Sequence, residues 1–83
     1  MKTLIKWLLE HGFKIDENYI SESYVSAKCN IDNIDHCAYI THTRQGYKCE
    51  YCEWVSNNFG RHSTYPLTTR IKDVIDFLTN KII

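Results

Sequence analysis

The chain has 83 residues, room for one domain spanning residues 1–83, and its ten Lys and Arg residues balance ten Asp and Glu residues. Hydrophobic residues make up 43% and aromatic residues 13% of the chain, which excludes intrinsic disorder. A net charge of zero argues against nonspecific nucleic-acid binding, because each neutralised phosphate needs a cation, although a local basic stripe is compatible with it.

A short amphipathic helix is predicted at the start of the chain. Thr3 suits its N-cap, and Gly12 suits the position after the last turn, where a left-handed backbone is favoured. Phe13 follows at a position from which it can fold back on the helix. The predicted apolar stripe consists of Leu4, Ile5, Leu8 and Leu9. A helix this short needs tertiary packing to be stable.

Three β-strands are predicted next, over Ser23–Ile31, Ile34–Thr43 and Tyr47–Val55. The first strand alternates apolar and polar residues, which indicates a half-buried strand. Asp32-Asn33 predicts a tight turn between the first two strands. Gln45-Gly46 predicts a turn between the second and third strands, because glycine adopts a positive φ without steric cost.

The segment Ser56–Pro66 is predicted to be a loop, because it contains Gly60 and Pro66. A second amphipathic helix is predicted from an N-cap at Thr68 or Thr69 to the end of the chain. Its apolar stripe consists of Ile71, Val74, Ile75, Leu78 and Ile82.

These elements predict an α+β fold of the order α-β-β-β-α, in two layers, with a three-stranded antiparallel sheet and the N- and C-terminal helices on one face. The other face has no layer of its own. With Gln45-Gly46 as the turn, Arg44 pairs with Tyr47, and His42 pairs with Cys49. A one-residue slip would exchange the faces of one strand. The predicted open face carries Cys37, Tyr39, Thr41, Lys48, Glu50, Cys52 and Trp54.

Aromatic residues on the open face are the predicted partner-binding residues. If the first strand exposes Tyr24, it joins Tyr39 and Trp54 in an exposed cluster, and interfaces favour such residues because they bury a large area. In the alternative interpretation, these rings cover the sheet or pack beneath the following loop, since a thin domain needs every ring. The flanking residues expected to contribute are Glu50, Glu53, Asp73, Asp76 and Arg61.

The segment Tyr47–Cys52 resembles the aromatic-x-Cys-x-x-Cys opening of a zinc finger. Cys49, Cys52 and His62 are the candidate zinc ligands. A fourth would come from His42, His36, Cys37 or Cys29. However, residues three apart in a strand point to opposite faces, so Cys49 and Cys52 could not share a metal without a local turn. We therefore predict buried, inert thiols and no cofactor, with zinc as the alternative.

No catalytic site is predicted. His42 and Cys49 could form a nucleophilic pair, but no oxyanion-binding element accompanies them. The sequence offers no usefully spaced carboxylate pair and no glycine-rich phosphate loop. His11 and His36 are expected to face solvent or a helix end. The protein is therefore predicted not to be an enzyme.

Three family resemblances bear on the function. The order α-β-β-β-α is similar to that of double-stranded-RNA-binding domains, and Leu4–Lys14 resembles the opening of small toxin ribonucleases. The chain departs from the first family in having only Arg70 and Lys72 near its final helix, and from the second in having Ser21–Tyr24 where that family carries Gly-Ser-His. Size and layout also resemble small phage or mobile-element inhibitors of host defence, anti-CRISPR proteins included, which implies an inhibitor without a catalytic site.

The prediction is therefore an intracellular protein-binding inhibitor or adaptor that occupies a surface of a larger partner, including a nucleoprotein complex. The alternative is a nucleic-acid-binding module. Its candidate residues are Lys48, Arg44, Arg61, His62 and Arg70. The longest unbroken apolar run near the start, Trp7–Leu9, is too short for a secretory signal or a membrane span. We expect a cytoplasmic monomer or homodimer, in the host cytoplasm if phage-encoded, with reduced cysteines.

Overall fold

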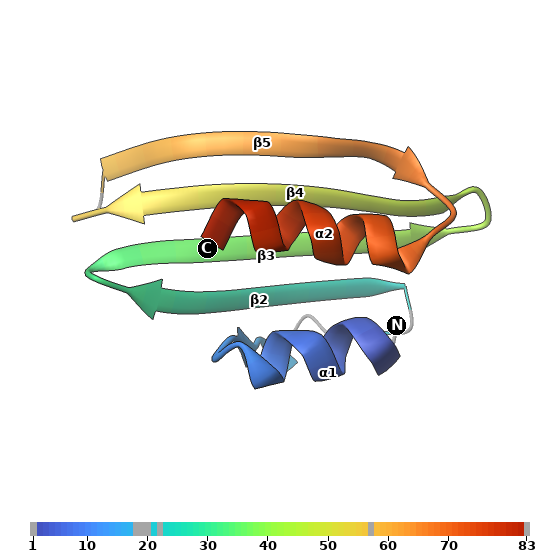
Figure 1. Cartoon of the computed structure of the whole chain (residues 1–83), viewed down its shortest axis with the longest axis horizontal. Coiled ribbons are helices and arrows are strands. Elements are labelled where there is room, and N and C mark those ends of the chain that lie inside the picture. Colours follow the sequence, from blue (N-terminus) through green and yellow to red (C-terminus); the bar gives the residue numbers. More distant parts are fainter. Residues whose placement is uncertain (1, 18–20, 22, 57, 83) are drawn as a thin grey trace.

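The computed structural model of the protein describes residues 2–17, 21, 23–56 and 58–82. Within this part of the chain, five strands form one antiparallel sheet whose spatial order is the chain order (Figure 1). The elements are α1 (Lys2–Glu10), β1 (Lys14–Ile15), β2 (Tyr24–Ile31), β3 (Ile34–Thr43), β4 (Gly46–Val55), β5 (Asn58–Thr68) and α2 (Ile71–Ile82).

The prediction of a three-stranded sheet is wrong, because the sheet has five strands. β5 occupies most of the segment Ser56–Pro66 that the sequence predicts as a loop; residue 57 lies outside the described residues. β5 is an edge strand, and its register against β4 shifts once beside Gly60 and once beside Pro66. Proline is tolerated at edge strands and bulges, so Pro66 does not end the strand. β1 has only two residues and is defined by its pairing with β2. Two residues are too few to show the alternation from which a strand is predicted.

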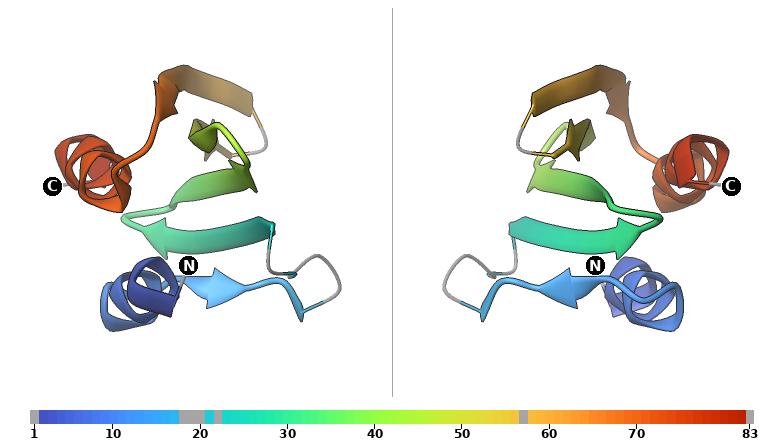
Figure 2. Two further views of the ribbon diagram at one scale, coloured as in Figure 1. Left: turned by 90° about the vertical axis from the view of Figure 1, so that its right-hand side faces the viewer. Right: turned by 90° about the vertical axis from the view of Figure 1, so that its left-hand side faces the viewer.

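Both helices pack on the same face of the sheet, as predicted (Figure 2). α1 lies against β1, α2 lies against β4 and β5, and the two helices contact each other. Among the described residues, no helix has the length and apolar composition needed to cross a bilayer. The buried side chains between helices and sheet include Leu4, Leu8, Val25, Ala27, Ala38, Ile40, Cys49, Tyr51, Val74 and Leu78. This face of the sheet is the hydrophobic core.

The two central hairpins fix which side chains share a face. The β2–β3 hairpin turns at Asp32-Asn33, whose φ angles of 54° and 66° are those of a tight hairpin turn, as predicted. The β3–β4 hairpin turns at Arg44-Gln45 instead of Gln45-Gly46, so each β4 residue lies two positions away from its predicted partner. A shift of two leaves every side chain on its predicted face, because side chains alternate with a period of two.

The end of α1 is the predicted glycine cap. Gly12 has a φ of 82°, and its N–H donates to the carbonyl of Leu9 at 3.2 Å. The N–H of Phe13 donates to the carbonyl of Leu8 at 3.0 Å, and the ring of Phe13 is buried. These two bonds satisfy carbonyls at the end of the helix and direct the chain towards β1.

The approach to α2 depends on Thr68 and Gly46. The hydroxyl of Thr68 accepts a bond from the N–H of Arg70 at 3.1 Å and donates to the carboxylate of Asp73 at 2.6 Å. A Cβ on Gly46, whose φ is 133°, would lie 2.3 Å from the carbonyl oxygen of Thr68. Glycine is therefore required where β4 begins beneath the chain that leads into α2.

Candidate functional site

The candidate site is the face of the sheet opposite the helices, which no other layer covers in the described part of the chain (Figure 2). We call it the open face. The strand register sorts its side chains into rows that run across the sheet. These rows are Tyr24–Thr41–Lys48, Ser26–Tyr39–Glu50–Thr64, Lys28–Cys37–Cys52–His62 and Asn30–Asp35–Trp54–Phe59. All seven residues predicted for the open face from the second and third strands lie in them, which confirms the face assignment.

Tyr39 lies at the centre of the open face, between two shallow hollows. The first has a volume of about 310 Å³ and brings Tyr39 together with Tyr24 and Glu50, three of the predicted partner-binding residues. Thr41 and Lys48 complete its lining. Burial raises the pKa of Tyr39 to about 12, so its hydroxyl is protonated at neutral pH and can donate a hydrogen bond.

The second hollow, of about 320 Å³, lies on the β1 side of Tyr39. Its lining includes Lys14, Asp16, Lys28 and Cys37. Lys28 also forms an ion pair of 3.4 Å with Asp35. Both positive and negative side chains therefore lie around the hollows. The lysines are Lys14, Lys28 and Lys48, and the carboxylates are Asp16, Asp35 and Glu50.

Trp54 does not join Tyr24 and Tyr39, so the predicted cluster of three rings is not formed. Tyr39 lies opposite Glu50, whereas Trp54 lies opposite Asp35, towards the other end of β4. Trp54 instead packs edge-on against Phe59, with ring centroids 5.2 Å apart. These rings are 39% and 56% exposed. Phe59 is not among the predicted residues, because it lies in the segment Ser56–Pro66 that is predicted as a loop.

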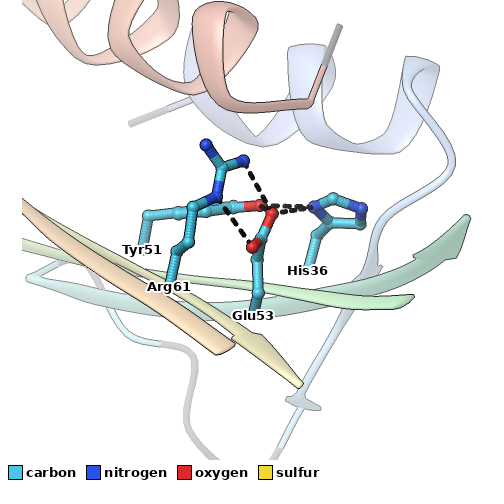
Figure 3. A network of polar contacts seen from close by, with 4 residues as sticks. All are labelled: His36, Tyr51, Glu53 and Arg61. Carbon is cyan, nitrogen blue, oxygen red and sulfur yellow. Dashed lines mark hydrogen bonds and ion pairs between the residues drawn. The ribbon is translucent and has the colours of Figure 1, made fainter. Parts of the chain in front are cut away.

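Arg61, a predicted partner-binding residue, belongs instead to a cluster on the helix-covered face (Figure 3). Its guanidinium donates from Nε to Oε1 of Glu53 at 2.9 Å and from Nη2 to Oε2 at 2.8 Å. The hydroxyl of Tyr51 donates to Oε2 of Glu53 at 2.8 Å. Because that hydroxyl already donates its proton, it accepts the hydrogen bond from Nδ1 of His36. We call these four residues the buried cluster because His36, Tyr51 and Glu53 are buried; the side chain of Arg61 is 64% exposed.

The buried cluster consists of one ion pair, between Arg61 and Glu53, and of two further polar side chains that are hydrogen-bonded to it. Hydrogen bonds from Arg61 hold the pKa of Glu53 at about 2, far below its usual 4.5. Burial, together with the bond to Glu53, raises the pKa of Tyr51. A carboxylate with so low a pKa is a weak base, and both its oxygens are bonded. The arrangement therefore suits structural support better than proton transfer. The prediction that His36 faces solvent or a helix end is wrong, because His36 is 6% exposed.

The structure does not bring the candidate zinc ligands together. Cys49 is fully buried on the helix-covered face, whereas Cys52 lies on the open face opposite His62. In the described ranges, no group of three or more His, Cys, Asp or Glu side chains is placed to hold a metal ion. The separation of Cys49 from Cys52 follows from the two-residue period of a continuous strand.

The hypothetical nucleophilic pair of His42 and Cys49 is not formed either. Cys49 lies opposite Ile40, and His42 stacks on Tyr47 with ring centroids 4.2 Å apart. Burial raises the pKa of Cys49 to about 12, which keeps its thiol protonated and unreactive. The prediction of a buried thiol is confirmed for this residue.

Comparisons of the chain with known protein families, with curated proteins and with solved structures find no significant match. The function must therefore be inferred from the geometry of the chain itself.

Proposed function

We propose that this protein is a protein-binding module, an inhibitor or adaptor that occupies a surface of a larger partner through the open face. The observation that supports the proposal is that the open face, although no other layer covers it in the described part of the chain, carries large aromatic side chains. Tyr24 and Tyr39 lie beside shallow hollows, and Trp54 stands exposed at the end of the same face. Aromatic rings with polar atoms are the side chains that contribute most to protein interfaces.

The edges of the sheet are less suited to a partner than the open face. A long, flat edge strand can pair with a strand of another chain, and proteins shorten, twist or interrupt such edges. On one side β1 has only two residues. On the other, β5 carries two register shifts and Pro66, which has no N–H to donate. We therefore assign partner binding to the open face and not to an edge.

Charge on the open face favours a protein partner over nucleic acid. The three lysines around the hollows are accompanied by three carboxylates, and a phosphate backbone would be repelled by the latter. The basic residues of the alternative hypothesis are dispersed. Arg44 lies in the β3–β4 turn, Arg61 is bonded to Glu53, and Arg70 lies 3.9 Å from Asp73. A protein surface of mixed charge matches this pattern better.

The test compares one substitution on the open face with one away from it. Tyr39→Ala removes the ring between the two hollows, and Leu9→Ala removes an apolar side chain that is 57% exposed on α1. Wild-type protein and both variants are immobilised after circular dichroism has verified their folds, and partners are captured from lysate. We expect a partner that the wild type and Leu9→Ala retain and Tyr39→Ala loses. Equal capture by all three proteins would contradict the proposal.

A second measurement separates the two classes of partner. Labelled duplex and single-stranded oligonucleotides are titrated at two salt concentrations, because binding to phosphates weakens steeply as salt rises. We expect no saturable binding at either concentration. Tight, salt-sensitive binding that Lys48→Gln weakens would replace the proposal with the nucleic-acid hypothesis.

A further inference from the structure

Cys37 and Cys52 lie directly opposite each other on the antiparallel strands β3 and β4. Both belong to the open face, in the row that also contains Lys28 and His62. Opposed residues of antiparallel strands have Cα atoms about 4.5 or 5.5 Å apart, depending on their place in the hydrogen-bond pattern. Both separations fall within the range of about 4.4–6.8 Å that a disulfide spans. The Cα separation expected for the pair is therefore compatible with a disulfide.

The remaining two cysteines are on the opposite side of the sheet. Cys29 lies opposite His36, and Cys49 lies opposite Ile40, all on the helix-covered face. Both thiols are buried there, at 7% and 0% exposure. Neither can reach a thiol of the open face through the sheet. The four cysteines thus divide into one opposed pair on the open face and two buried thiols on the helix-covered face, of which Cys29 also lines a hollow of about 490 Å³.

Small thiol reagents have access to the opposed pair. That access is through Cys52, which is partly exposed; Cys37 is only 6% exposed, and it lines the hollow of about 320 Å³ beside Lys28 and Tyr39. Burial raises the pKa of both thiols, so both are protonated at rest. At Cys37, the hydrogen bond with Tyr39 and the positive charge of Lys28 lower the pKa and so offset part of the increase caused by burial. A nearby cation favours the thiolate, which is the form that attacks a disulfide.

We propose that Cys37 and Cys52 are a redox-modification site, at which the two thiols form a reversible disulfide across β3 and β4. The oxidant is a small disulfide such as glutathione disulfide. The thiolate of Cys52, the more exposed residue, attacks one sulfur and releases one glutathione thiolate, which takes up a proton. The thiolate of Cys37 then attacks the sulfur of Cys52 and expels the second glutathione. Two protein thiols become one disulfide, and one glutathione disulfide becomes two glutathiones.

This site is independent of the proposed function, because its chemistry needs no protein partner. Its position nevertheless matters for the open face. The bridge would join β3 to β4 between the Tyr39 hollows and the exposed pair of Trp54 and Phe59. Oxidation would therefore link β3 to β4 covalently within the open face.

The experiment uses the folded wild-type chain and needs no substitution. The reduced protein is incubated with glutathione and glutathione disulfide at stepped ratios, quenched with acid and unfolded in mildly acidic denaturant containing excess N-ethylmaleimide, so that the buried thiols are also alkylated, and it is then analysed by intact mass. We expect the number of alkylated thiols to fall from four to two as the ratio becomes oxidising. Proteolytic mapping should then find Cys37 linked to Cys52, and dithiothreitol should restore all four thiols.

Matched substitutions make the assignment specific. Cys29→Ala, which alters only a core thiol, should still lose two thiols, whereas Cys52→Ser should end with no intramolecular bridge. Three results in the wild type would overturn the proposal. These are four thiols that stay free at every ratio, a mapped bridge that includes Cys29 or Cys49, and stable glutathione adducts without a bridge.

Discussion

Both faces of the sheet carry glutamates, but only the helix-covered face buries one. Glu53 is 8% exposed, and Arg61 and Tyr51 donate hydrogen bonds to its carboxylate. Glu50, three positions earlier on the same strand, has a side chain that is 58% exposed and lies 4.0 Å from His62. The same residue type is therefore a fixed structural charge on one face and a solvent-facing charge on the other.

The difference indicates that residues of the helix-covered face mainly stabilise the fold, whereas the open face carries the residues that we propose bind a partner. Burial on the helix-covered face provides most of the stabilising apolar contact, because both helices and the fully buried side chains are there. Side chains of the open face are under little such constraint, so they can combine aromatic rings, thiols and opposite charges. Substitutions on the two faces should therefore differ in whether they change stability or binding.

The largest expected effect contrasts two neighbouring leucines of α1. Leu8 is fully buried against the sheet, and Leu9 is 57% exposed. Leu8→Ala should lower the free energy of unfolding by about 2–5 kcal/mol, which is comparable with the whole stability of so small a domain. Leu9→Ala should change it by less than about 0.5 kcal/mol. Urea denaturation followed by circular dichroism measures both, and similar losses would show that α1 is not anchored as described.

The next contrast concerns the two glutamates of β4. Glu53→Gln removes the charge that accepts bonds from Arg61 and Tyr51 and should cost about 1–3 kcal/mol at neutral pH. Glu50→Gln, on the open face, should change stability by less than about 0.5 kcal/mol. The same denaturation experiment compares them. An equal effect of the two substitutions would mean that the buried cluster is no more stabilising than a surface charge.

The buried cluster also predicts an acid dependence of stability. Because the pKa of Glu53 is about 2 in the fold and 4.5 without it, the ionised carboxylate stabilises the fold fully above pH 4.5. That stabilisation should be lost progressively as the pH falls from 4.5 towards 2. Unfolding free energies at stepped pH should decline more steeply for the wild type than for Glu53→Gln. Parallel curves would contradict the low pKa.

The smallest expected effect is the coupling between the two exposed rings of the open face. Trp54 and Phe59 meet edge-on at 5.2 Å between centroids. Trp54→Ala, Phe59→Ala and the double variant form a thermodynamic cycle, whose coupling energy should be about 0.5–1.5 kcal/mol. A coupling energy near zero would show that the two rings do not pack on each other in solution.

The central hairpins could be predicted from the sequence because their signals are local. The strand Ile34–Thr43 is found where alternation predicts it, and Gly12 ends α1 as its position suggests. β5 could not be found in this way, because its bulges interrupt the alternation and Pro66 normally argues against a strand. β1 has two residues, too few for any periodic pattern.

The candidate site was predicted in part for the same reason. Alternation alone placed Tyr39 and Glu50 on the open face, even though the assumed turn gave the wrong register. The buried cluster was missed, although a signal exists. His36 and Glu53 have the same position in the alternation as the buried Ala38 and Tyr51, which marks them as inward-facing polar residues. Arg61 could not be assigned to them, since it depends on the unrecognised bulge of β5.

The agreement between strand order and chain order has a consequence for how the protein folds. Every strand pairs only with its neighbours in sequence, so each hairpin can close over a short stretch of chain. On a ribosome, β2 and β3 can pair before β4 has been synthesised, and each later strand then adds to an existing edge. Nascent chains therefore need not wait for their last residues to begin forming the sheet, and α2 closes the core when it arrives.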